Sequence, residues 1–470
     1  DICSRVHELG GLWKMSIPFQ QRTAKSSSLF NEALQCIPGG VTANIKYFKP
    51  YPIIMEKAKG PHLYDVDGNE YIDYNLCYGA LILGHGHPEI TSAFYNLLLE
   101  IGTTVYGTPH KYEISMAQKL VELFPSIEKV RFTNSGLEAT LLALRFAMAW
   151  TKRKKIAKFE GHYHGSHDQV LVSVNPSKRT TNQPPIVTSD SLGLPDYYLE
   201  NTIMLPFNDL EQTAEILTKH KDELAAVILE PIQGGFIPPD PTFLRELRRL
   251  TSEYQIPLIF DEVKTGFRMG IAGAQGIYQV KPDLTALGKV LGGGFPAGAV
   301  GGKKEILDLS SPIGGVNILV DPTASSETHK PLFHSGTYNG HPLIMHAGLK
   351  TIEILSRENL YEKLEQQTKR LRKGIEQLGE KYGLPVQTVG VGSIFNVLFT
   401  NKPIRQIQDV LASDLSMRKS LDNYLIKHGI FVKPMNRFSM SIVHDQPIIE
   451  QTLERFEAAF KDLTKNKSKK

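Results

Sequence analysis

Lys289 and Asp261 stand in sequence contexts where their side chains could do chemistry together. Lys289 opens the glycine-rich run Lys289-Val290-Leu291-Gly292-Gly293-Gly294, and Asp261 closes an apolar run, 258–260, earlier in the chain. A neutral lysine amine can form a Schiff base with a carbonyl. Ligands of open α/β sheets bind at the carboxyl ends of strands. Taken singly, Lys289 could be a surface lysine before a turn, and Asp261 could cap a helix or hold a metal. The order of a Walker loop is absent.

A second stretch is suited to holding an anion. In Thr133-Asn134-Ser135-Gly136-Leu137-Glu138 an expected strand runs into an expected helix. The free N–H groups and the dipole of a helix N-terminus bind phosphate well. The spacing of Ser135 and Glu138 also fits an ordinary capping box.

A third stretch is rich in rings: Glu160-Gly161-His162-Tyr163-His164-Gly165-Ser166-His167. Three histidines suggest a metal, but they have no acidic partner at helical spacing, and the flanking glycines indicate a turn. We expect no metal here. A ring that lies flat on the ring of a cofactor fits better.

These stretches converge on one ligand. An aspartate for a protonated ring nitrogen, a lysine for an aldehyde, a helix N-terminus for a phosphate and a ring for stacking are what pyridoxal phosphate requires. We therefore expect pyridoxal phosphate as the cofactor.

Alternating apolar runs and helical periods predict an α/β fold with a mainly parallel central sheet. Beyond about residue 340 helical patterns dominate and predict a smaller C-terminal domain. The segment from Val174 to Asn201 has no clear period, and a lid is a plausible role for so long a loop. Expected strands are 155–159, 225–229, 257–260 and 297–300, with an apolar run at 393–399, and expected helices are 137–150, 243–254 and 342–355.

Composition excludes several classes of protein. The 470 residues include 53 basic and 49 acidic side chains, giving a net charge of +4. The basic residues are scattered, which argues against a nucleic-acid partner. No segment approaches the roughly 18 apolar residues that span a bilayer, so no membrane is expected. Three cysteines without metal-ligand spacing, together with an N-terminus lacking an apolar signal core, favour a reducing, cytoplasmic location.

From about Ile37 to Leu463 the chain resembles the class III aminotransferases, and among them most closely the glutamate-1-semialdehyde 2,1-aminomutases. The stretches that carry the resemblance are Pro38-Gly39-Gly40-Val41, Asp67-Gly68-Asn69-Glu70, Gly84-His85-Gly86-His87-Pro88-Glu89, Asn134-Ser135-Gly136, Tyr163-His164-Gly165, Asp261-Glu262-Val263, Thr265-Gly266-Phe267-Arg268 and Gly336-Thr337-Tyr338-Asn339-Gly340-His341-Pro342. The resemblance implies fold type I, with a small α+β C-terminal domain. The implied ranges are 1–85 for an N-terminal segment packing with the small domain, 86–335 for the large cofactor-binding domain and 336–470 for the small domain.

The resemblance also assigns roles to residues. Lys289 would carry the Schiff base and shuttle the proton, and Asp261 would pair with the pyridine nitrogen. The remaining cofactor contacts would sandwich the ring, hold the phosphate or lie near the ring. They are Val263 and Tyr163 for the ring, Ser135, Gly136 and Leu137 for the phosphate, Thr337 reaching the phosphate from a second subunit, and Glu230 nearby. The family implies a homodimer with shared active sites.

The substrate positions depart from the aminomutase pattern. Lys46 stands nearest to a usual arginine, and Tyr78 replaces a usual tryptophan. Around Arg437 the usual carboxylate is missing and the segment looks shorter. Gly235 occupies the place of the switch glutamate of the omega-aminotransferases. We take Lys46, Tyr78 and Arg437 as candidate substrate residues, because lysine and arginine are not interchangeable at a carboxylate.

The sequence thus predicts a transaminase with an amino-acid donor. Its expected acceptor is a β-keto acyl chain on a carrier protein of a lipopeptide or polyketide assembly line, an antibiotic-producing multifunctional enzyme from which this domain would be excised. Lys178 and Arg179 of the expected lid could then meet the carrier. The alternatives are the aminomutase of tetrapyrrole synthesis and another omega-aminotransferase. A non-catalytic binding protein is disfavoured because Lys289 and Asp261 are both present.

Overall fold

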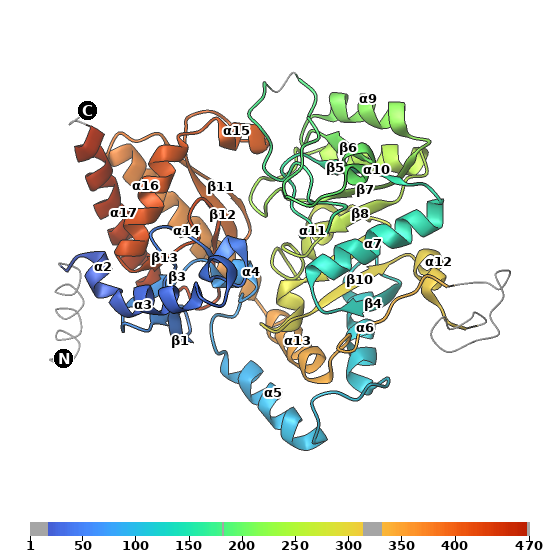
Figure 1. Ribbon diagram of the computed structural model, residues 1–470, viewed down its shortest axis with the longest axis horizontal. Helices are drawn as coiled ribbons and strands as arrows, with labels where there is room; N and C mark the ends of the chain where they lie inside the picture. Colours follow the sequence, from blue (N-terminus) through green and yellow to red (C-terminus); the bar gives the residue numbers. More distant parts are fainter. Residues whose placement is uncertain (1–16, 181–182, 314–330, 468–470) are drawn as a thin grey trace.

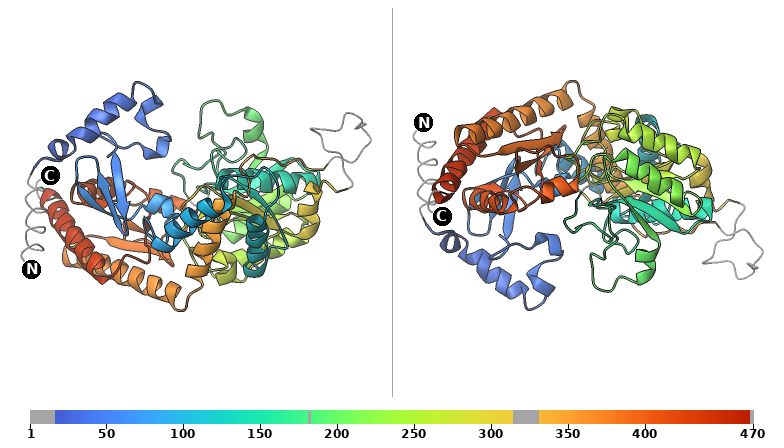
Figure 2. Two further views of the ribbon diagram at one scale, coloured as in Figure 1. Left: turned by 90° about the horizontal axis from the view of Figure 1, so that it is seen from below. Right: turned by 90° about the horizontal axis from the view of Figure 1, so that it is seen from above.

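The computed structural model describes residues 17–180, 183–313 and 331–467. Two lobes lie side by side in Figures 1 and 2. One is built from the middle of the chain, and the other joins the N-terminal segment to the C-terminal segment. The predicted ranges 1–85, 86–335 and 336–470 stay a prediction, and residues 1–16, 181–182, 314–330 and 468–470 of them lie outside the described residues.

The middle of the chain forms a seven-stranded sheet in the order β4-β10-β9-β8-β7-β5-β6. Strand β10 is antiparallel to both its neighbours, β4 and β9, whereas the other pairings are parallel. The expectation of a mainly parallel sheet is met, and the four expected strands lie in β5, β7, β8 and β10. The strands are β4 (Lys129–Thr133), β5 (Lys155–Phe159), β6 (Thr202–Leu205), β7 (Leu224–Leu229), β8 (Leu258–Asp261), β9 (Leu284–Gly288) and β10 (Gly298–Gly302).

Helices cover both faces of this sheet, which explains why its strands read as continuous apolar runs and not as alternating ones. In β7, Ala226 and Ile228 pack in one core with α7 (Gly136–Thr151). The intervening Val227 and Leu229 pack in another core with α10 (Phe243–Glu253). Successive side chains of a strand point to opposite faces, so one strand serves both cores. The same packing fixes where α7 begins relative to the strand ends.

The second lobe holds two smaller sheets. β1 (Met55–Lys59), β2 (His62–Asp65) and β3 (Glu70–Asp73) are antiparallel, and β13 (Ile430–Phe431) joins β3 in parallel. β11 (Val386–Val391), β12 (Ile394–Phe399) and β14 (Phe438–Ser439) form the other sheet. The Tyr74 hydroxyl lies 2.7 Å from the Thr452 hydroxyl, so the N-terminal segment packs against the last helix. Segments from the two ends of the chain therefore share one core.

Long helices complete both lobes. α13 packs between α5 and α6 and against the turn after Lys289, while α14 and α17 pack together. These helices are α5 (Pro88–Ile101), α6 (Lys111–Leu123), α9 (Leu210–His220), α13 (Pro342–Leu355), α14 (Leu360–Lys381), α16 (Leu415–Lys427) and α17 (Gln446–Lys467). The shorter ones are α2 (Phe19–Arg22), α3 (Ala24–Ala33), α4 (Leu76–Gly79), α8 (Asp196–Glu200), α11 (Gly273–Tyr278), α12 (Lys304–Leu307), α15 (Ile407–Leu411) and the 3-10 turns η1 (Pro38–Gly40), η2 (Asn44–Lys46), η3 (Lys289–Gly292) and η4 (Asp308–Ser310).

A buried arginine ties the two lobes together. Arg268, 1% exposed, follows β8 in the large lobe. Its Nε donates to the Gly79 carbonyl at 2.9 Å, and its Nη1 donates to the Ser393 hydroxyl at 2.9 Å and the Met440 carbonyl at 2.6 Å. These acceptors belong to the other lobe, so Arg268 holds the lobes in register beside the carboxyl end of the sheet.

Candidate active site

A cavity of about 170 Å³ lies at the carboxyl ends of the central strands. Strands β8 and β9 end there, and α7 begins there, because parallel strands deliver their carboxyl ends to one edge of a sheet. Most of the sequence-predicted cofactor residues meet in its wall. The lining residues are Gly136, Leu137, Tyr163, His164, Gly165, Asp261, Val263, Lys264 and Lys289.

Lys289 directly follows β9 and has a left-handed backbone, with φ 48°. This conformation costs a non-glycine residue energy, and such strain clusters at functional sites. Burial lowers the pKa of the Lys289 amine to about 8, and the nearby cations Lys264 and Arg437 act in the same direction. Near neutral pH a larger fraction of this amine is therefore uncharged than for an exposed lysine.

Asp261 is the last residue of β8 and is 4% exposed. Its Oδ2 lies 2.7 Å from Nδ1 of the buried His164, and its Oδ1 accepts the Val263 N–H at 3.0 Å. The carboxylate is therefore oriented from two sides. His164 Nε2 is buried and has no hydrogen-bond partner among the described residues. In the sequence, His164 stood out only as one of several ring-bearing residues. Its position next to Tyr163 was the one feature that could have pointed to a role.

The first turn of α7 offers backbone donors to an anion. Ser135 is the N-cap, and its hydroxyl accepts the Glu138 N–H at 3.2 Å. The N–H groups of Gly136 and Leu137 have no acceptor within the helix, because the first turn of any helix leaves its donors unpaired. A Cβ on Gly136 would lie 2.6 Å from Val263 Cγ1, so only glycine fits between the helix and the loop that follows β8. The capping and anion-binding interpretations of Ser135 therefore coexist.

Glu230 supports two residues of the cavity wall, Tyr163 and Lys264. It is buried, forms an ion pair with Lys264, and its Oε2 accepts the N–H groups of Tyr163 at 3.1 Å and Gly234 at 3.3 Å. Burial opposes ionisation of Glu230, but the Lys264 cation, helped by His162 and His164, more than offsets it and lowers the pKa to about 2. Glu230 is thus a carboxylate at neutral pH. The sequence did not predict a role for Lys264.

The residues present fit pyridoxal phosphate. An amine of lowered pKa, a buried carboxylate, free helix N-terminal donors and an aromatic ring line one cavity, with Val263 also in its wall. Gly136 has no side chain and can therefore lie close to Val263. As a result, backbone atoms and not a side chain face the cavity at the start of α7. When bound, the cofactor supplies an electrophilic carbonyl and an acceptor for electrons.

The three candidate substrate residues lie in different settings. Arg437 is buried in part, and its Nη2 donates to the Tyr78 carbonyl at 3.0 Å, so these two meet. A Cβ on Gly235 would lie 3.7 Å from Arg437 Nε, so Arg437 covers the position where a switch glutamate was expected. Lys46 is exposed and donates to the Thr42 hydroxyl at 2.8 Å. It is not among the residues that line the cavity with Lys289.

Thr337 is exposed, in the loop before α13, and does not line its own chain's cavity.

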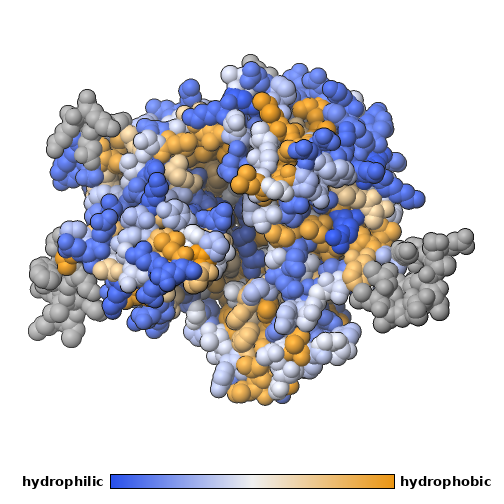
Figure 3. All heavy atoms as spheres, viewed as in Figure 1, coloured by the Kyte–Doolittle hydropathy of each residue, from blue (hydrophilic) through white to orange (hydrophobic). Residues whose placement is uncertain are grey.

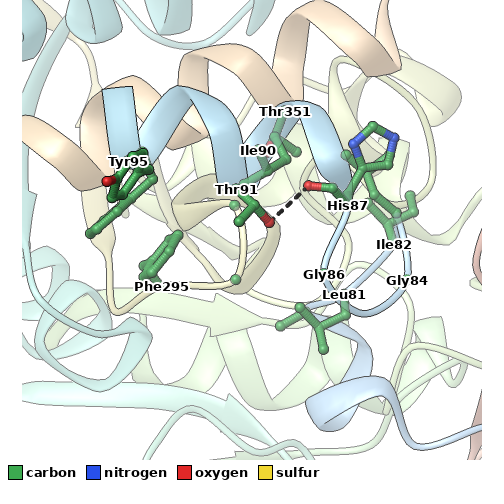
Figure 4. A pocket seen from close by; sticks show the side chains of 15 residues that line it. Leu81, Ile82, Gly84, Gly86, His87, Ile90, Thr91, Tyr95, Phe295 and Thr351 are labelled. Atoms are coloured by element: carbon green, nitrogen blue, oxygen red, sulfur yellow. Dashed lines mark hydrogen bonds between the residues drawn. The ribbon is translucent and has the colours of Figure 1, made fainter. Parts of the chain in front are cut away.

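A separate, largely apolar cavity of about 390 Å³ lies between α5 and the glycine turn after Lys289. In Figure 4, Ile90, Thr91 and Tyr95 point from α5 toward it, facing Phe295. Tyr95 and Leu99 are 60% and 64% exposed, and Figure 3 shows apolar surface where Figure 1 places α5.

One expectation about the long loop is wrong. Arg179 is not available to a carrier protein, because it forms a buried ion pair with Glu160: its Nη2 lies 2.7 Å from Oε2 and its Nε lies 3.0 Å from Oε1. Gln408 of α15, in the other lobe, also donates to Glu160 at 3.2 Å. The start of the loop is therefore fastened to both lobes. Residues 181–182 lie outside the described residues.

The other histidines have separate partners. His162 Nδ1 accepts the Glu230 N–H at 3.0 Å, and His167 Nε2 lies 3.2 Å from the Thr140 hydroxyl. Within residues 17–180, 183–313 and 331–467, no group of three or more histidines, cysteines and acids is arranged to hold a metal. In the same part of the chain, no helix has the length and apolar character needed to cross a membrane.

The sheet topology and the lysine-containing cavity together define a fold-type I pyridoxal-phosphate enzyme. The family model "Aminotransferase class-III" matches residues 45–460, and the chain belongs to this family. The expected family, fold class, enzyme class and cofactor are confirmed.

The relatives refine this picture. The chain is 42% identical over 450 residues to a glutamate-1-semialdehyde 2,1-aminomutase of Thermodesulfovibrio yellowstonii, covering 94% of this chain and all of that one. A second aminomutase, from Brevibacillus brevis, is 41% identical over 93% of this chain and 98% of its own length. Among solved structures, an omega-transaminase from Sphaerobacter thermophilus has a TM-score of 0.87 at 36% identity. The match covers 93% of this chain and 97% of that one. A β-phenylalanine aminotransferase from Variovorax paradoxus has a TM-score of 0.79 at 29% identity, covering 94% and 95%.

Proposed function

We propose that this chain is an omega-type aminotransferase acting on free substrates that carry a carboxylate. In this proposal Lys289 binds the cofactor and moves the proton at the substrate carbon. Asp261, oriented by His164, keeps the cofactor ring nitrogen protonated. The α7 N-terminus from Ser135 to Leu137 would hold the phosphate, and Tyr163 and Val263 would contact the ring.

The observation that carries the substrate proposal is Arg437. Its guanidinium lies over Gly235 and close enough to Lys289 to affect the pKa of that amine. Among the residues that the structure describes, it bonds neutral acceptors, the Tyr78 carbonyl and the Asn436 side-chain oxygen, and its Nε is buried without a hydrogen-bond partner. A cation so placed is suited to a substrate carboxylate, which arginine can bind with two parallel hydrogen bonds. The names of the structural relatives, an omega-transaminase and a β-phenylalanine aminotransferase, support amination away from the α-carbon.

The aminomutase is the second candidate, because the curated relatives at 41–42% identity carry that name over nearly their whole length. These names favour the aminomutase over the carrier-bound β-keto chain expected from the sequence. None of the relatives reported above is named for a carrier-bound substrate. The commitment of Arg179 to Glu160 also removes one of the two loop cations that would have met a carrier.

We further propose a homodimer in which Thr337 of each chain reaches the phosphate site of the other. The exposed setting of Thr337 supports this proposal, as do the exposed apolar side chains of α5 and α6, among them Tyr95, Leu99 and Ile114. Class III aminotransferases are typically dimeric, as the resemblance implied.

One assay separates the candidates. The holoenzyme is given glutamate-1-semialdehyde without an amino donor, and separately a panel of amino-acid donors with β-keto and aldehyde acceptors. Donor-dependent amination that weakens in Arg437→Gln supports the aminotransferase. Rapid donor-independent conversion of the semialdehyde would instead establish the aminomutase. Activity confined to acyl chains on a carrier protein would contradict both.

A further inference from the structure

Lys264 is a second lysine in the wall of the active-site cavity. It follows Asp261 and Val263 on the loop that leaves β8, and its side chain is 11% exposed. A lysine is rarely this buried unless it is paired. None of the roles proposed above for binding the cofactor or the substrate uses it.

The partner of Lys264 is Glu230. Its Oε1 pairs with Lys264 Nζ, and its Oε2 accepts the backbone N–H groups of Tyr163 and Gly234 at 3.1 Å and 3.3 Å. Glu230 therefore uses both oxygens within the protein. A carboxylate at 3% side-chain exposure needs such compensation, because removing one member of a buried ion pair leaves a costly unpaired charge.

Lys264 also contacts the stacking ring. Its Nζ lies 5.5 Å from the centroid of the Tyr163 ring, within the range of a cation–π interaction. One ammonium group thus touches the ring of Tyr163 and also the carboxylate that holds the backbone of Tyr163. The three side chains form a closed unit on one side of the cavity.

We propose that Lys264 is a positioning residue: a fixed internal cation, anchored by Glu230, that sets Tyr163 in place and puts a positive charge in the cavity wall that it shares with Lys289. This inference rests on the proposed function, because it takes Lys289 as the cofactor lysine and Tyr163 as the stacking ring. It adds a distinct role, since Lys264 neither binds the substrate nor exchanges a proton.

The charges around Lys289 make the inference testable. Lys264 and Arg437 disfavour its protonation, whereas Asp261 and Glu230 favour it. Burial is the largest influence on its pKa, and Lys264 is the next, ahead of Glu230. Other titratable groups also face these lysines. The Cys77 thiol feels the charge of Lys289, and the buried His162 feels the charges of Lys264 and Glu230. Lys264 and Glu230 carry charges of opposite sign. Removing one or the other should therefore shift the pKa of the Lys289 amine in opposite directions.

The experiment uses the holoenzyme and four variants: Lys264→Met, Lys264→Arg, Glu230→Gln and the double variant Lys264→Met/Glu230→Gln. The first measurement is the pH titration of the visible absorbance of the lysine-bound cofactor. The second is competitive acetylation of the full-length chain across pH, read for the Lys289 peptide by mass spectrometry after the cofactor has been removed.

The expected midpoints follow from the charges. Lys264→Met removes a cation and leaves Glu230 unpaired, so both midpoints should rise by about one pH unit. Glu230→Gln leaves Lys264 uncompensated, so they should fall. The double variant should return toward the wild-type value, and Lys264→Arg should stay close to it because the charge is kept. Looser packing of Tyr163 should appear as weaker cofactor binding in Lys264→Met.

Equal midpoints in the wild type, Lys264→Met and Glu230→Gln would overturn the inference, even if the variants were less stable, because a purely structural ion pair changes stability alone. If Lys264→Met does not fold, a Glu230→Gln midpoint that rises or stays unchanged overturns it equally. Failure of the proposed function looks different: the wild type would then show no cofactor attached to Lys289, while the acetylation midpoint of Lys289 would still shift among the variants.

Discussion

His164 Nδ1 lies 2.7 Å from Asp261 Oδ2, and both side chains are buried at the carboxyl end of β8. A second contact, from the Val263 N–H at 3.0 Å, fixes the other carboxylate oxygen. Asp261 is therefore held from two sides in the wall of the cavity that it shares with Lys289. This pre-organised anion is what a protonated ring nitrogen requires.

Asp261→Asn should keep the shape of the side chain and remove its charge. We expect amino-transfer turnover to fall by about a hundredfold to a thousandfold, with the cofactor still bound, because the electrostatic partner of the ring nitrogen is lost. Stopped-flow measurement of the first half-reaction in the cofactor-saturated variant checks this. His164→Asn is the matched comparison, since it removes one hydrogen bond to a charged group and should cost about tenfold to a hundredfold. Turnover near the wild-type rate in Asp261→Asn would rule out this role.

Much of this site could be predicted from short sequence runs. Strand ends followed by a helix start, at Ser135, and by charged side chains, at Asp261 and Lys289, give the edge of the sheet its chemistry. The parallel arrangement then brings these residues together without further information. Each of these residues could be predicted from the sequence because it lies at or near the end of a recognisable strand.

Other features depend on contacts between distant segments. The pairing of Lys264 with Glu230 and of Arg179 with Glu160 is set by side-chain geometry across loops, which no local pattern records. The antiparallel entry of β10 requires glycine at Gly298, where a Cβ would collide with the Ser135 carbonyl and the Thr133 hydroxyl. The exposed position of Lys46 likewise follows from the path of the N-terminal segment.

Arg437→Gln should weaken the binding of carboxylate substrates. The KM of the substrate should rise about tenfold to a hundredfold, with a smaller change in kcat, because a charge-assisted hydrogen-bonded pair is lost. Steady-state kinetics with a carboxylate substrate and its methyl ester check this. The ester should be nearly insensitive to the substitution. An equal loss for acid and ester would show that Arg437 acts on the fold and not on the carboxylate.

Thr337→Ala tests the shared site. If Thr337 reaches the partner's phosphate, cofactor affinity should fall by about fivefold to tenfold while the dimer persists. In mixed dimers of Thr337→Ala with a Lys289→Ala chain, the one site that keeps Lys289 receives the native Thr337 of the partner, so its cofactor affinity should return to the wild-type value. Light scattering reports the oligomeric state. A fully active monomer would refute the arrangement.

The lowered pKa of Lys289 predicts how cofactor loading depends on pH. Only the neutral amine attacks a carbonyl, and the pKa is about 8. The rate of cofactor uptake by the cofactor-free protein should therefore rise about tenfold per pH unit below that value and level off above it. Rapid-mixing absorbance measurements from about pH 6 to about pH 10 check this. This range extends about two pH units to either side of the pKa of Lys289. A rate still climbing at the upper limit would indicate an ordinary, exposed lysine.

Attachment of the cofactor to Lys289 is the central claim, and reduction with borohydride followed by peptide mapping tests it most directly. The wild-type holoenzyme should yield one modified peptide carrying the reduced cofactor on Lys289. Lys289→Ala should lose the label and the visible absorbance, and Lys264 should stay unlabelled because its amine is engaged in the ion pair with Glu230. Label on Lys264 or any other lysine of the wild-type protein, with Lys289 unmodified, would contradict the account.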